Sequence, residues 1–107
     1  MAFIPVNLIE DPEYVDPEDV EVQTNDTILF LNDTNYMFTV IIKKADTVFV
    51  TQSKTLVYDV FAGEVEKTPK IKANPELPLQ YEVYIYVNDA ITPSDAPPRI
   101  ILHQDWD

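Results

Sequence analysis

Apolar and polar residues alternate with a period of two along most of the chain, and the spacing typical of an amphipathic helix is almost absent. In residues 80–87 every second side chain from Tyr81 to Val87 is large and apolar, whereas Tyr84 and Tyr86 fall on the opposite face. Such alternation predicts a β-strand with one buried side and one aromatic outer side. Further runs rich in β-branched and aromatic residues predict strands at 3–9, 20–23, 27–31, 36–43, 48–52, 55–61 and 99–103.

The prolines lie between these runs, where a missing amide donor harms no ladder, and only Pro5 falls inside one. Pro5 therefore predicts an edge or a bulge for the first strand. Seven or eight short strands in about 100 residues predict an all-β fold, a two-sheet antiparallel sandwich formed by residues 1–107 as a single domain. Residues 28–31 and 36–42 are apolar on nearly every position, which favours strands central in a sheet or covered at one end.

The composition is that of a folded domain with an acidic surface. Apolar residues make up 46% of the 107 positions and there is no cysteine, so we expect a packed core without disulfides. The formal net charge of −12 argues against nucleic acid and anionic lipid as partners, because both require clustered Lys and Arg. The six lysines all fall in residues 43–72. No run approaches the ~20 apolar residues of a membrane span and the start lacks the features of a signal peptide, so the compartment stays open.

The order of the strand segments resembles a known sandwich. Residues 20–32 form a strand, a turn and a strand ending in Leu31-Asn32; residues 36–40 begin the next strand; residues 81–85 precede a loop and the last strand at 98–103. This order is similar to that of the cupredoxin fold, the Greek-key sandwich of the blue copper proteins. The motifs are features that β-sandwiches share in general, and an immunoglobulin-like topology remains the alternative.

The chain departs from the cupredoxin pattern where copper would bind. A blue copper centre needs a Cys thiolate, two imidazoles and a weak axial Met. The resemblance puts Phe38 at the first His, Ile85 at the Cys, Asn88 at the second His and Pro93 near the Met. None of these side chains is a suitable ligand. We therefore expect a copper-free version of the fold, with apolar side chains at the former ligand end, no intrinsic electron transfer and no cofactor.

An acidic segment is the one candidate metal site. Residues 10–21 hold seven carboxylates without a basic neighbour, and such hard oxygens suit Ca²⁺. No Asp-x-Asp-x-Asp-Gly loop is present, so a solvated acidic loop and a docking site for a basic partner are the alternatives. The candidate Ca²⁺ ligands are Glu10, Asp11, Glu13, Asp16, Glu18 and Asp19.

The residues of common catalytic sites are missing. His103 is the only histidine and has no nucleophile motif beside it. Gly63 is the only glycine, which excludes a glycine-rich phosphate-binding loop. Asn25 and Asn32 each begin an Asn-Asp-Thr triplet, which matches the glycosylation pattern and also suits a turn at a strand end. These observations favour a protein that is not an enzyme.

Exposed aromatic residues are the candidate interaction surface. Tyr84 and Tyr86, with Tyr58 or Phe61 on a neighbouring strand, form an expected outer stripe, and Trp106 lies near the carboxyl end. Tyrosine and tryptophan suit protein interfaces and sugar stacking, although such a stripe also occurs under a covering layer. The sequence predicts a non-enzymatic interaction or structural module that binds a protein partner or self-associates through an edge strand or the tyrosine face. The alternative is an accessory domain that binds Ca²⁺ or carbohydrate.

Overall fold

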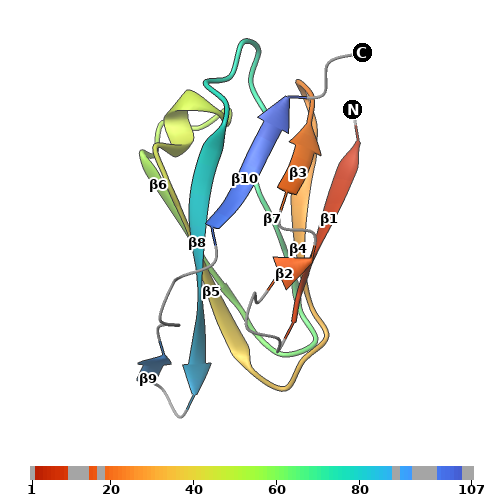
Figure 1. Cartoon of the computed structure of the whole chain (residues 1–107), viewed down its shortest axis with the longest axis vertical. Helices are drawn as coiled ribbons and strands as arrows, with labels where there is room; N and C mark the ends of the chain where they lie inside the picture. Colours follow the sequence, from red (N-terminus) through yellow and green to blue (C-terminus); the bar gives the residue numbers. More distant parts are fainter. Residues whose placement is uncertain (1, 10–14, 17–18, 88–89, 93–98, 105–107) are drawn as a thin grey trace.

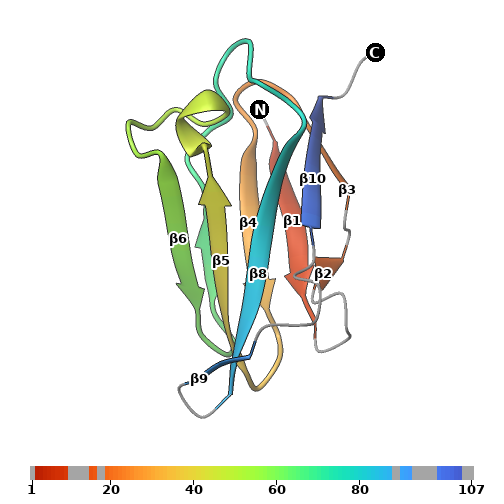
Figure 2. The same ribbon diagram turned by 60° about the vertical axis from the view of Figure 1, so that its left-hand side comes forward.

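The chain folds into two β-sheets packed face to face (Figures 1 and 2). The computed structural model describes residues 2–9, 15–16, 19–87, 90–92 and 99–104, with side chains up to residue 85. Sheet A consists, in spatial order, of β2 (Val15–Asp16), β1 (Phe3–Leu8), β4 (Thr27–Asn32) and β7 (Val65–Lys67). Sheet B consists of β3 (Asp19–Val22), β10 (Arg99–Gln104), β8 (Leu79–Val87), β5 (Met37–Lys43) and β6 (Thr55–Val60), with β9 (Ala90–Thr92) beside β8.

The predicted two-sheet sandwich is confirmed, with sheets that are mostly antiparallel. Two pairs are parallel: β1 lies beside β4, and β3 lies beside β10. Each parallel pair joins strands that are separated along the chain by a crossing to the other sheet. Pro5 lies in β1 opposite Leu29 of β4, on the stretch of β1 that β2 does not pair, because β2 reaches only Asn7 and Leu8. Proline therefore occupies an edge stretch, as expected.

Alternating residues of both sheets fill the space between them. Phe30 of β4 and Tyr81 of β8 are buried and meet edge to face, with ring centroids 5.8 Å apart. Phe38 of β5 is also fully buried and belongs to the same core cluster. Burying side chains of this size stabilises the fold by roughly 1.5–3 kcal/mol each. The period of two in the sequence thus marks which face of each strand enters the core.

The predicted strand at residues 48–52 is wrong. A 3-10 helix spans Ala45–Thr47, and beyond it only Phe49 makes an isolated bridge, to Ile71. Val48 and Phe49 are both buried although they are consecutive, which a flat strand with one covered face does not allow. These apolar residues anchor a loop over the end of the core. The short strands β2, β7 and β9 were not predicted.

The loops at the two ends of the sandwich differ in charge. Backbone hydrogen bonds join the two loops at one end: Val50 N donates to Lys70 O, Lys72 N to Val48 O and Glu76 N to Thr47 O. This lysine end, formed by residues 43–54 and 68–78, lies at the top of Figure 1. The opposite end holds residues 33–36 and 61–64, with Asp33 and Glu64 exposed. Five of the six lysines of residues 43–72 thus lie at one end of the molecule, and the sixth, Lys67, lies in β7.

Candidate functional site

The positions assigned to two blue-copper ligands meet in space but carry hydrocarbon. Phe38 of β5 and Ile85 of β8 are direct partners in the antiparallel ladder. Their side chains are 0% and 8% exposed, and both belong to the main core cluster. Neither side chain has a donor atom for a metal, so the residues present do not fit a copper ion. Asn88 and Pro93, the other two positions, lie outside the described residues.

Asn32 at the end of β4 organises this end of the sandwich. Its side chain is 3% exposed, and its Nδ2 donates hydrogen bonds to Tyr36 O (2.6 Å) and Val60 O (2.8 Å). Its Oδ1 accepts from Thr34 N (3.0 Å) and from Thr34 Oγ1 (2.7 Å). One amide thus connects the loop before β5 to the end of β6. Because Nδ2 is buried and occupied, Asn32 acts as the expected strand-end turn residue, and this amide is not accessible for glycosylation in the folded chain.

The turn between β6 and β7 is held against the same residue. Gly63 N donates to Asn32 O (2.7 Å), and Asn32 N donates to Glu64 O (3.0 Å). Gly63 has φ +77°, a conformation that glycine adopts without the steric cost of a Cβ. The sole glycine of the chain therefore permits a turn whose backbone is bonded to β4, as the sequence indicated.

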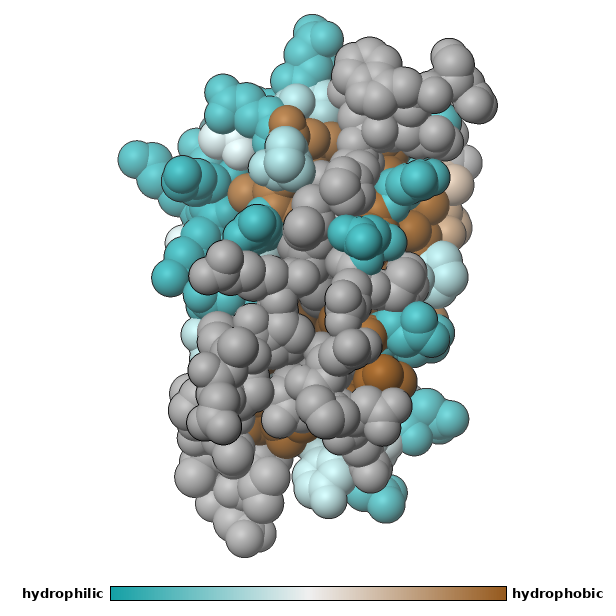
Figure 3. Space-filling model, in the orientation of Figure 1, coloured by the Kyte–Doolittle hydropathy of each residue, from teal (hydrophilic) through white to brown (hydrophobic). Residues whose placement is uncertain are grey.

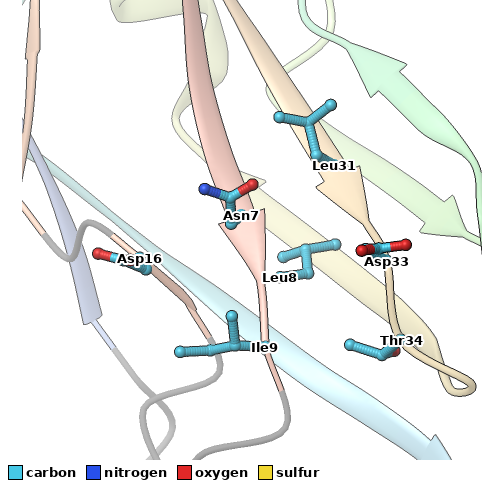
Figure 4. Close-up of a pocket in the computed structure, with 7 residues that line it drawn as sticks. All are labelled: Asn7, Leu8, Ile9, Asp16, Leu31, Asp33 and Thr34. Atoms are coloured by element: carbon cyan, nitrogen blue, oxygen red, sulfur yellow. The ribbon is translucent and has the colours of Figure 1, made fainter.

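A shallow hollow lies beside Asn32, on the outer side of sheet A (Figure 4). Asn7 and Asp16, partners across β1 and β2, line one side, and Asp33 and Thr34 beyond β4 line the other. Leu31 lies between them, and a second hollow continues from it past Gly63, Glu64 and Val65. The floor is therefore apolar and the rim carries carboxylates.

The structure does not assemble the candidate Ca²⁺ ligands among the residues it describes. Asp16 lies in β2 of sheet A, whereas Asp19 begins β3 of sheet B. Glu10, Asp11, Glu13 and Glu18 lie outside the described residues. Within the described part of the chain, no group of three or more His, Cys, Asp or Glu side chains is arranged to hold a metal ion. Calcium binding by the acidic segment stays a prediction.

The outer face of sheet A carries an apolar surface that the sequence analysis missed. Pro5 is the register partner of Leu29, and Leu31 is the register partner of Val65, so these side chains are neighbours on one face. Phe3 is 61% exposed and Val65 52%, whereas Leu29 and Leu31 are half-buried. We call this surface the sheet A face, defined by Phe3, Pro5, Leu29, Leu31 and Val65. Figure 3 shows apolar surface between polar patches on the right-hand side, where Figure 1 places β1.

A signal for the sheet A face was present in the sequence. Residues 28–31 are apolar on every position, and such a run predicts a strand central in its sheet or covered at one end. The strand β4 is indeed central, between β1 and β7. Its inner residues Ile28 and Phe30 are fully buried, but the outer residues Leu29 and Leu31 have only half-buried side chains. An apolar run on both faces therefore marked one core face and one exposed face.

The predicted aromatic stripe is only partly assembled. Tyr84 lies on the outer face of sheet B, beside Thr39, and its hydroxyl donates to Glu82 Oε2 (2.6 Å). This hydrogen bond raises the pKa of Tyr84. Tyr58 does not join the stripe, because it is the partner of buried Val40 and faces the core. The side chains of Tyr86 and Trp106 lie outside the described part, and Phe61 is 53% exposed just after β6.

Two core-facing tyrosines have perturbed ionisation. Burial, and secondarily the negative charge of Glu66, raises the pKa of Tyr58 to about 12. Burial alone raises the pKa of Tyr81 further. The Tyr81 hydroxyl is buried and has no hydrogen-bond partner among the described residues. The shift of the Tyr81 pKa thus reflects burial in the core, and that of the Tyr58 pKa reflects burial together with the charge of Glu66.

The remaining candidates add no catalytic group. The backbone of His103 lies in β10 opposite Glu21 of β3, and its side chain is outside the described part. Asn25 has φ +72°, and its backbone N–H donates to Ile71 O, so it forms a turn as expected. Within the described residues, no helix has the length and apolar character needed to cross a membrane.

Comparison with known proteins identifies the fold. No family model matches the chain, and no curated protein matches it. Among solved structures, that of auracyanin B, a cupredoxin, matches with a TM-score of 0.55 and 15% sequence identity, covering 97% of this chain and 88% of that chain. The fold is cupredoxin-like. At 15% sequence identity, this likeness supports the predicted resemblance and concerns the fold alone.

Proposed function

We propose that this chain is a non-enzymatic, copper-free interaction module that binds a protein partner through the sheet A face. The observation that carries the proposal is the row of apolar side chains on the outside of sheet A, with Phe3 61% and Val65 52% exposed. Contiguous apolar surface costs solvation free energy, roughly 25 cal/mol for each Å² left in water. Such patches on folded domains usually mark binding sites.

The former ligand end supports a role without copper. Phe38 and Ile85 fill the space between β5 and β8 with hydrocarbon, and the full chain contains no cysteine to supply a thiolate. Asn32 uses both of its side-chain functions to hold loops together. These residues stabilise the end of the sandwich and offer no side-chain atom that could bind a copper ion for electron transfer.

The rim of the sheet A face indicates the chemistry of the partner. Asp16, Asp33 and Glu64 border the hollows next to Leu31 and Val65, and exposed Lys67 lies opposite Leu29 on the same face. The chain as a whole has a net charge of −12. A partner with an apolar centre and Lys or Arg at its border would bury the former and pair the latter with these carboxylates. Opposite charge would also accelerate association at low ionic strength.

The proposal can be tested by selecting binders from a random peptide library displayed on phage, with the immobilised protein as target. We expect enriched peptides that combine large apolar residues with Lys or Arg. The selected peptides should bind V65T and V65K at least about tenfold more weakly than the unmodified protein. The matched control is V50K, at a residue that is 63% exposed in the lysine end, and it should bind normally. Failure to enrich any peptide, or equal binding to V65K and V50K, would overturn the proposal.

A further inference from the structure

The four sheet edges of the sandwich differ in how they are protected from pairing with another chain. Edge strands usually carry proline, lysine, inward charges or a very short length, because their unpaired amides and carbonyls are open to a further strand. In sheet A, β1 contains Pro5, and β7 has three residues, two of them charged. In sheet B, β3 contains Asp19 and Glu21. These three edges therefore carry features that hinder pairing with another chain.

The fourth edge, β6, has none of these protections. It has six residues, Thr55–Val60, without proline or lysine, and it pairs with β5 alone among the described residues (Figure 2). Its one charged side chain is already engaged, because Asp59 Oδ1 accepts a hydrogen bond from Thr39 Oγ1 (2.8 Å) across the sheet surface. Val57 in the middle of the strand is 58% exposed. The edge is thus open, regular and weakly charged.

We propose that β6 pairs antiparallel with β6 of a second copy of this chain, about a twofold axis at Val57, which joins the two B sheets into one. A twofold axis makes the contact self-complementary and closes it at the dimer. This inference uses a different surface from the sheet A face and does not rest on it.

The sequence of β6 selects this register. With the axis at Val57, the two copies of Val57 lie opposite each other, Leu56 lies opposite Tyr58, and Thr55 lies opposite Asp59. In this register each odd-numbered residue faces an odd-numbered residue, and each even-numbered residue faces an even-numbered one. Antiparallel pairing requires this match, because each edge strand directs the backbone N–H and C=O of only every second residue toward the new partner. Branched, aromatic and Thr–carboxylate pairs of this kind stabilise antiparallel strands.

Other registers of the same strand are less favourable. An axis at Asp59 would place two carboxylates directly opposite each other, which is destabilising. An axis at Tyr58 would place Asp59 of each copy opposite the apolar Val57, so the carboxylate would gain no polar partner from the second copy. The side chains of Leu56 and Tyr58 are half-buried in the single chain, so a second strand would cover the part of each that is still exposed.

Sedimentation equilibrium over a range of protein concentrations tests the association. The contact is small, so we expect a reversible dimer with a Kd between roughly 1 µM and 1 mM. V57K, which puts two lysines on the axis, should raise the Kd at least about tenfold. T55K, which puts a lysine opposite Asp59, should lower the Kd. V50K serves as the control for added charge, and equal melting temperatures would show that the variants remain folded.

The register can be tested with single cysteines, because the chain has none of its own. A cysteine on the twofold axis meets its own copy at a distance that a disulfide can span, whereas T55C and D59C face a different residue. We expect V57C to form a covalent dimer under mild oxidation, faster than T55C and D59C do. A strict monomer, cross-linking no faster at V57C than at T55C, or a dimer that V57K leaves intact would overturn the inference. A dimer lost in V65K and kept in V57K would place association at the sheet A face instead.

Discussion

Replacing Asn32 by alanine tests whether one buried amide holds the end of the sandwich together. The substitution removes two donated hydrogen bonds, to Tyr36 O and Val60 O, and two accepted ones from Thr34. The bond to Val60 O is buried, and its loss leaves a carbonyl without a partner, which costs about 1–3 kcal/mol. The other three bonds are partly buried, so water replaces them in part and each contributes about 0.5 kcal/mol.

Together these losses predict that N32A lowers the free energy of unfolding by about 3 kcal/mol. For a domain of this size that corresponds to a fall in Tm of about 12 °C. Urea denaturation followed by circular dichroism measures the free energy of unfolding, and a thermal melt followed by the same signal measures Tm. N35A, at an exposed neighbouring asparagine, is the matched control and should change stability by less than about 0.5 kcal/mol.

N32D separates the donated hydrogen bonds from the accepted ones. Its carboxylate keeps the shape and the acceptor for Thr34, but it turns a negative charge toward the carbonyls of Tyr36 and Val60. N32D should therefore be at least as unstable as N32A at pH 7. It should regain stability relative to N32A as the pH falls and the carboxyl becomes a donor. If N32A unfolds within about 1 kcal/mol of the unmodified protein, the role assigned to this amide is wrong.

Three further predictions follow from single residues. Y81F should raise the free energy of unfolding by about 1 kcal/mol, because the Tyr81 hydroxyl is buried without a partner among the described residues; a less stable Y81F in urea denaturation would mean that the hydroxyl is bonded. The pKa of Tyr58 is raised above 10.0 to about 12, so the stability held by its neutral form is complete below pH 10 and is lost as the pH rises toward 12. Y58F should make that alkaline fall in Tm shallower, and an unchanged profile would contradict the assignment. A Cβ at Gly63 meets nothing within 4 Å, so a substitution there costs stability only through the positive φ. G63A should therefore cost about 1 kcal/mol, and G63N less, because asparagine adopts the left-handed conformation more readily than alanine; equal losses in both variants would refute this reasoning.

Most of the strands could be predicted because their two faces differ. In β8 the buried residues Tyr81, Val83 and Ile85 alternate with the less buried Glu82 and Tyr84, and this alternation defines the strand without knowledge of its partners. The short strand β7 could not be found in the same way. It has three residues, and what makes it a strand is its pairing with Leu29 to Leu31 of β4.

The face of a strand is less predictable when both faces contain large side chains. The run 55–61 has Leu56, Tyr58 and Val60 on one face and Val57 on the other, so composition alone does not decide which face is buried. Pairing of Tyr58 with Val40 of β5 decides it. The tyrosine then packs in the core, with its ring centroid 6.0 Å from that of Phe30.

The site residues depend on contacts between distant parts of the chain. Asn32 was recognised as a turn residue, but its bond to Val60 O spans 28 positions and is not visible in the local sequence. The sheet A face likewise needs the parallel pairing of β1 with β4, which places Phe3 opposite Thr27 and Pro5 opposite Leu29. The absence of blue-copper ligands, in contrast, was evident from the sequence, because it depends only on residue types at known positions.

The most direct test of the central claim is to map a bound peptide on the protein by NMR. A selected apolar and basic peptide would be titrated into isotope-labelled protein, and the amide and methyl shifts followed to saturation. We predict the largest shifts at Phe3, Leu29, Leu31 and Val65, with little change at Val50 or Tyr84. Saturable shifts centred on Tyr84 of sheet B, with the sheet A face unchanged, would contradict the claim.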